Sequence, residues 1–127
     1  MQFARRVFLA AAIYGLLVVT PMYFLESRIG EQQPPPITHV EYFYGFVGLA
    51  LVWQLVFLLI ARHPIKYRTL MLFAILEKAS FGLVVPVLFA MGRAPFPILI
   101  GSTIDLVWLV LFAIAYGKTP DRETSIV

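Results

Sequence analysis

The sequence contains no cysteine, and only 13% of its 127 residues are charged. Without cysteine the chain has no disulfide, thiolate nucleophile, thiol redox relay, Cys-ligated zinc or iron–sulfur cluster. The two histidines, His39 and His63, fall in different expected loops, which argues against a histidine-based metal or haem site. We therefore expect no metal and no cofactor.

Apolar residues, in contrast, make up 61% of the chain, and its mean hydropathy is +0.86. An average soluble domain is about 45–50% apolar and about 25% charged. A soluble domain of this size leaves much of its surface in contact with water, so it cannot hide so many apolar side chains. The low charge excludes a disordered chain. The composition predicts an integral membrane protein.

Four apolar runs divide the sequence at about 5–25, 39–62, 68–92 and 96–117. A helix needs about 20 mostly apolar residues to cross about 30 Å of hydrocarbon, and all four runs qualify. Strands are not expected, because period-two alternation is absent and lipid-exposed sheet edges are forbidden. The sequence predicts an all-α protein: a membrane-spanning antiparallel four-helix bundle that forms a single transmembrane domain over residues 1–127, with almost nothing outside the spans. The first span is expected to remain uncleaved, because its apolar stretch is longer than that of a signal peptide.

Basic residues are unevenly distributed between the expected loops. Seven fall on one side of the bundle: Arg5, Arg6, Arg62, Lys66, Arg68, Lys118 and Arg122. The opposite side has only Arg28 and Arg93. The positive-inside rule then places both termini and the middle loop in the cytoplasm. This asymmetry accounts for the isoelectric point of about 9.5 without a nucleic-acid partner, and the expected partner is the lipid bilayer.

Several polar residues fall inside the expected spans, and they form a candidate intramembrane polar site: Gln54, Glu77, Lys78, Ser80 and Asp105. A charge at the centre of a span costs roughly 2.5–3.5 kcal/mol, so these groups need partners. At about 1.5 Å per residue, Gln54, Glu77 and Asp105 lie about 10, 12 and 18 Å from the cytoplasmic ends of their helices. They therefore share one layer of the bundle. Glu77 and Lys78 are about 100° apart around their helix, which predicts that they point in different directions.

Two interpretations of the polar layer remain open. Intramembrane carboxylates indicate a functional site by default, here for binding or for handling protons. The same residues also fit a structural clasp that joins the second, third and fourth helices. Lys78 is expected to snorkel toward the cytoplasm or to pair with Asp105, with a direct substrate role as the alternative. Gln54 is expected to donate a hydrogen bond to a neighbouring helix.

Helical spacing gives the polar residues their neighbours. Glu77 shares a face with Phe81, and Asp105 shares one with Gly101 and Trp108. Trp108 and Trp53 lie in mid-span, where each is a candidate wall of a ligand cavity or a simple core residue.

Other local signals mark bends and helix ends. Pro86 is expected to bend the third helix, and the sequence Thr38-His39-Val40-Glu41 fits a capping box at the start of the second helix. Walker A, GxGxxG, HExxH and GxSxG motifs are all absent, so no catalytic residue is assigned.

In the stretches Tyr42–Gly48 and Leu76–Phe81, together with Arg62, Pro64 and Tyr67-Arg68, the sequence resembles a group of small uncharacterised four-span bacterial integral membrane proteins with no assigned activity. The resemblance implies the inner membrane of a bacterial cell. Small multidrug resistance transporters are similar in length, but their essential carboxylate is in the first helix, where this chain has none. The EXPERA group of sterol isomerases and ligand-binding proteins also has four spans with buried acids, but its motif does not match this sequence.

We expect a non-enzymatic membrane protein that binds an apolar small molecule, or partner helices as in a homo-oligomer, around the polar cluster. One alternative is a proton-coupled small-molecule transporter that acts as an oligomer. Another is a membrane-embedded isomerase-like enzyme that uses Glu77 and Asp105 and requires an enclosed pocket of roughly 300 Å³ or more.

Overall fold

The structure is a computed structural model that describes residues 2–121, and this part of the chain is helical without a strand. The prediction of an all-helical protein is confirmed. The elements in chain order are α1 (Gln2–Val19), a 3-10 helix (Thr20–Phe24), α2 (Glu26–Gln32), α3 (Val40–Arg62), α4 (Arg68–Gly82), α5 (Val84–Ala90) and α6 (Phe96–Lys118).

Four helical segments are long and apolar enough to cross a membrane: Gln2–Phe24, Val40–Arg62, Arg68–Ala90 and Phe96–Lys118. They overlap the four apolar runs of the sequence. The first segment is α1 together with the 3-10 helix, in which Pro21 occupies one of the first positions. The third segment is α4 followed by α5. Two of the four segments are therefore not continuous α-helices.

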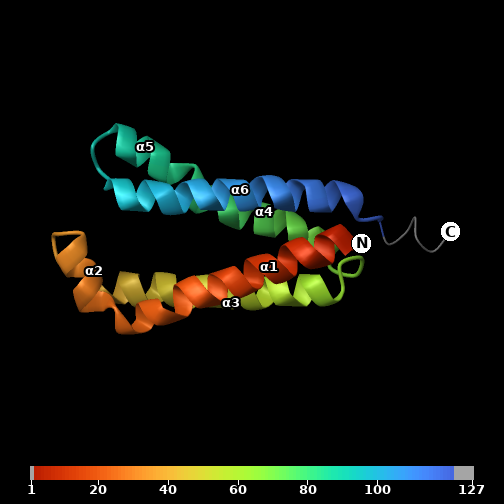
Figure 1. The fold of residues 1–127 in the computed structure, drawn as a ribbon, viewed down its shortest axis with the longest axis horizontal. Helices are drawn as coiled ribbons and strands as arrows, with labels where there is room; N and C mark the ends of the chain where they lie inside the picture. The colour runs from red at the N-terminus through yellow and green to blue at the C-terminus, as the bar shows by residue number, and fades with distance from the viewer. Residues whose placement is uncertain (1, 122–127) are drawn as a thin grey trace.

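The interruption between α4 and α5 lies one turn before Pro86. The Leu83 N–H still donates to the Ala79 carbonyl at 2.9 Å, and α4 ends at Gly82. Pro86 has no N–H to donate to the Gly82 carbonyl four residues earlier, and its ring crowds that position. The bend expected from Pro86 therefore takes the form of a break, after which α5 leans away from α6 (Figure 1).

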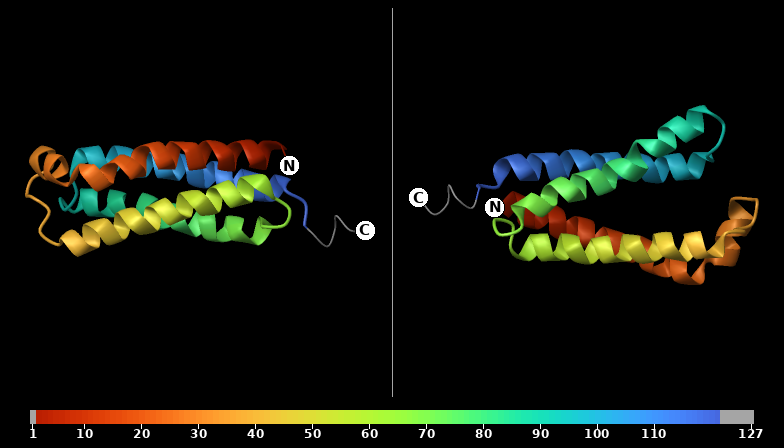
Figure 2. Two further views of the ribbon diagram at one scale, coloured as in Figure 1. Left: turned by 90° about the horizontal axis from the view of Figure 1, so that it is seen from below. Right: turned by 180° about the vertical axis from the view of Figure 1, so that it is seen from behind.

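The long helices form two pairs, in which α1 packs along α3 and α4 packs along α6 (Figure 1). The pairs meet at the end that holds the N-terminus and the α3–α4 connection. They diverge toward the end that holds α2 and the α5–α6 connection (Figure 2). This divergence opens the space in which the candidate site lies.

The hydrophobic core is concentrated where the two pairs meet. Its centre is a cluster of three phenylalanines, one each from α1, α3 and α6, all fully buried: Phe8, Phe57 and Phe112. The rings of Phe8 and Phe112 stack with centroids 4.3 Å apart, and Phe57 meets Phe112 edge-on at 5.1 Å. Met71 and Ala74 add the contribution of α4. The core thus joins the two pairs at the end where they converge.

The outward faces of the four segments are apolar and exposed. Leu17, Val52, Leu76 and Val107, one from each segment, are all more than half exposed. Such a surface is unfavourable in water and favourable in lipid.

The short helix α2 follows the first segment, and its Glu26 accepts a hydrogen bond of 3.0 Å from the Tyr44 hydroxyl of α3. The prediction of a capping box at the start of α3 is wrong. His39 is the N-cap of α3 without a side-chain capping bond, and Glu41 lies 3.5 Å from His39 Nδ1 instead.

Candidate functional site

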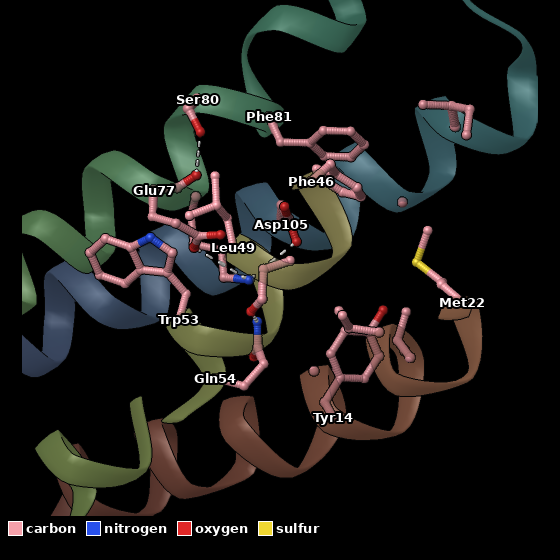
Figure 3. A pocket seen from close by; sticks show the side chains of 17 residues that line it. Tyr14, Met22, Phe46, Leu49, Trp53, Gln54, Glu77, Ser80, Phe81 and Asp105 are labelled. Carbon is pink, nitrogen blue, oxygen red and sulfur yellow. Dashed lines mark hydrogen bonds and ion pairs between the residues drawn. The ribbon is translucent and has the colours of Figure 1, made fainter. Parts of the chain in front are cut away.

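A cavity of about 480 Å³ lies between the two helix pairs where they diverge (Figure 3). It is lined by residues of α1, the 3-10 helix, α3, α4 and α6, and most of the lining side chains are apolar or aromatic. All five residues of the polar site inferred from the sequence line it: Gln54, Glu77, Lys78, Ser80 and Asp105. The structure therefore brings together in one cavity residues from three helices that are far apart in sequence.

Lys78 is the central residue of the polar group. Its Nζ lies 3.4 Å from Asp105 Oδ1 on α6 and 3.8 Å from Glu77 Oε2 on its own helix. The Lys78 side chain is only 7% exposed, whereas those of Glu77 and Asp105 are each 19% exposed. Of the arrangements expected for Lys78, the structure has the ion pair with Asp105. We call Glu77, Lys78 and Asp105 the ionic cluster.

The expected separation of Glu77 and Lys78 is wrong for their charged ends. Their Cβ atoms leave the helix about 100° apart, yet the ammonium and one carboxylate oxygen approach to 3.8 Å. Both side chains are long enough to curve toward the same point, so the angle around the helix does not fix where the charges lie. Lys78 Nζ also lies 5.2 Å from the ring centre of Phe57, which ties the cluster to the edge of the core.

Gln54 does not form the expected bond to a neighbouring helix. Its Nε2 donates to the Ala50 carbonyl of its own helix at 2.9 Å, and its buried Oε1 has no hydrogen-bond partner among the described residues. The side chain occupies the space beside Gly15 of α1, where a Cβ would overlap the Gln54 amide group. Gln54 therefore fixes how closely α3 approaches α1. Within the five-residue polar site, the described contacts between helices join α4 to α6, through Lys78 and Asp105, which is narrower than the expected three-helix clasp.

Ser80 lines the cavity but does not bond to another helix among the described residues. Its hydroxyl donates to the Glu77 carbonyl on the same helix at 2.7 Å (Figure 3).

The two tryptophans differ in role. Trp53 lines the cavity, as expected for a wall residue, but Trp108 does not. Trp108 lies one turn beyond Asp105 toward the convergent end, where it packs against Tyr14 and Phe112 with ring centres 5.9 and 6.2 Å away. Of the two roles left open for Trp108, cavity wall or core residue, the structure has core packing.

Several further lining residues carry no polar signal in the sequence, among them Tyr14, Met22, Phe46, Phe81 and Gly101. Helical spacing from Glu77 and Asp105 indicates Phe81 and Gly101. Tyr14 and Met22 belong to the first segment, which has no charged residue at this depth, so nothing in the sequence marks the face that it turns toward the cavity.

The arrangement is an amphipathic cavity with aromatic walls and a charged region at one side. Its volume falls in the range of small-molecule sites, about 300–1,000 Å³. Beside Gly101 there is open space, since a Cβ there would meet nothing within 4 Å. The cavity can therefore accept an apolar body and offer polar contacts at one of its ends.

Comparisons of the chain with protein-family models, with curated proteins and with solved structures found no match.

Proposed function

We propose that the chain is an integral membrane protein that crosses the bilayer as an antiparallel four-helix bundle. The support is the exposed apolar surface on all four segments, together with the inward position of the ionic cluster. An unpaired charge facing lipid would be costly. Here Lys78 is paired and covered, while large apolar side chains take the outer positions.

We assign both termini and the α3–α4 connection to the cytoplasmic side of a bacterial inner membrane. Arg5 and Arg62 are linked at the convergent end, where Arg5 Nη1 donates to the Arg62 carbonyl at 3.3 Å. Arg68 donates to the Thr119 carbonyl at the same end, at 2.8 Å. The divergent end has Arg28 and Arg93, and Arg122 lies outside the described residues. The distribution follows the positive-inside rule.

Within this membrane protein the cavity binds an apolar small molecule without catalysing a reaction. The observation that carries this proposal is a cavity of about 480 Å³ that is lined by Glu77, Lys78 and Asp105 together with aromatic side chains. A purely structural clasp needs an ion pair but no cavity beside it.

Trp53 provides a direct test of binding, because the chain has only two tryptophans and the other, Trp108, is outside the cavity lining. In a Trp108→Phe background, the fluorescence of Trp53 therefore monitors the cavity. We expect 6-bromo-2-naphthylmethanol, a neutral apolar quencher, to quench it saturably in lipid nanodiscs. Quenching that rises linearly and matches partition into protein-free nanodiscs would contradict the proposal.

A pair of glycine variants controls this test. Gly101 lines the cavity and Gly45 does not, and a Cβ at either position meets nothing within 4 Å. Gly101→Leu should fill the cavity and weaken binding at least tenfold, which corresponds to about 1.4 kcal/mol. Gly45→Leu adds the same side chain elsewhere and should leave the affinity unchanged. Equal affinities in the two variants would place the quencher outside the cavity.

A further inference from the structure

We propose, resting on the binding function above, that the ligand is an amphipathic organic cation: an apolar body with a protonated amine that contacts the carboxylates of the ionic cluster. The apolar and aromatic walls of the cavity indicate the apolar body of the ligand. The charges and hydrogen-bonding groups of the ionic cluster indicate its protonated amine.

The ionisable groups that line the cavity are two acids and one base, apart from the neutral Tyr14 phenol. With the carboxylates and the ammonium all ionised, the ionic cluster has a net charge of −1. The ammonium of Lys78 is covered and lies between the two carboxylates, whose side chains are the more exposed. An occupant of the cavity therefore meets a surface that is acidic in net charge. Apolar and aromatic walls lower the local dielectric, and there such a charge attracts a cation more strongly than it would in bulk water.

The unsatisfied groups point to the same ligand chemistry. Two buried side-chain atoms of the described residues have no hydrogen-bond partner, Gln54 Oε1 and Glu77 Oε2, and both are acceptors. The 3.8 Å between Glu77 Oε2 and Lys78 Nζ is too long for a hydrogen bond. A buried acceptor without a donor is costly. Small rotations of these side chains toward the cavity would let an ammonium group supply the missing donors.

The walls favour a cation over an anion. Tyr14, Phe46, Trp53 and Phe81 line the cavity, and the faces of aromatic rings attract ammonium groups. An amphiphile with a carboxylate head would compete with Asp105 and Glu77 for the ammonium of Lys78, and it would meet two like charges. A neutral amphiphile would gain the apolar contacts alone.

Three quenchers that share one ring system test the charge preference. They are 6-bromo-2-naphthylmethylamine, the corresponding alcohol and 6-bromo-2-naphthoic acid, titrated into the Trp108→Phe protein in phosphatidylcholine nanodiscs at pH 7. Affinities are corrected for partition into protein-free nanodiscs. We expect the amine to bind at least tenfold more tightly than the alcohol, and the acid to bind most weakly.

Asp105→Asn and Glu77→Gln each bring the net charge of the ionic cluster to zero. Both should remove most of the preference for the amine, measured within each variant as the ratio of the amine affinity to the alcohol affinity. Saturable binding of the alcohol shows that the variant still forms the cavity. If neither variant folds, the order of the three affinities in the Trp108→Phe protein, which keeps both carboxylates, still shows whether the cavity prefers a cation.

The outcomes separate this inference from the function on which it rests. If the alcohol binds as tightly as the amine, the cationic ligand is wrong and the binding function stands. If the acid binds most tightly, Lys78 is the anchor and the inference is again overturned. If none of the three binds saturably, the proposed function fails, and the inference fails with it.

Discussion

At the residue scale, the two carboxylates of the ionic cluster have different structural roles. Asp105 pairs with Lys78 across the interface between α4 and α6 at 3.4 Å, whereas Glu77 approaches Lys78 on the same helix. Loss of a charged hydrogen bond costs about 1.5–3 kcal/mol. Asp105→Asn should therefore lower the free energy of unfolding in detergent by about this amount, and Glu77→Gln should lower it by less. Equal stability of the two variants and the parent protein would show that the pair does not hold α4 to α6.

Gly15 and Gln54 form the second residue-scale contact that can be tested. A Cβ on Gly15 would overlap the amide of Gln54, and it would lie 2.8 Å from the Cγ of Gln54. Overpacking of this kind costs about 1–3 kcal/mol, so Gly15→Ala should reduce stability by that amount. The reduction should disappear in the Gln54→Ala background. Gly45→Ala, which adds a methyl group in open space, is the control and should be neutral or stabilising.

Sequence reasoning placed Gln54, Glu77 and Asp105 in one layer, because helical rise alone sets depth along an apolar span. It did not give the partners of these residues. The charged ends of Glu77 and Lys78 converge through side-chain torsions that the helical angle does not determine. Gln54 bonds to its own helix because a glycine on α1 leaves room for its side chain, and that pairing of α1 with α3 depends on tertiary packing.

At the element scale, the four long segments could be predicted because length and apolarity suffice to identify them. The helix α2 could not, since it is seven residues long and has no apolar period of its own. The divergence of the two helix pairs could not be predicted either. It depends on where the core is concentrated and on the break before Pro86. The sequence indicated the break but not the position of the core.

The phenylalanine cluster should hold the two pairs together. Phe112 stacks on Phe8 of α1 and meets Phe57 of α3, and it is fully buried. Phe112→Ala should destabilise the protein by on the order of 3 kcal/mol, because it leaves a void at the junction of the pairs. Val110 lies on the same helix, 54% exposed, so Val110→Ala should have little effect. Similar losses in the two variants, measured by unfolding in detergent, would argue against a core at this end.

At the scale of the whole molecule, the proposed orientation in the membrane rests on the basic residues at the convergent end. The chain has no native cysteine, so single cysteines give an unambiguous signal. Ser27 in α2 and His63 in the α3–α4 connection are both exposed, at opposite ends of the structure. Ser27→Cys should react with a membrane-impermeant maleimide in intact bacterial cells, and His63→Cys only after lysis. The reverse pattern would invert the proposed orientation.

The central claim is that the polar residues face the cavity between the two helix pairs while the apolar faces meet lipid. Collision of dissolved oxygen with nitroxide labels at Gly101→Cys and Val107→Cys, in protein reconstituted in a bilayer, tests it most directly. Both residues belong to α6. Gly101 lines the cavity, and Val107 is 55% exposed on the outer surface. We expect the label at 107 to collide often with oxygen and rarely with a water-soluble nickel chelate, and the label at 101 to collide less often with oxygen. Equal or greater oxygen contact at 101, or frequent nickel contact at 107, would contradict the account.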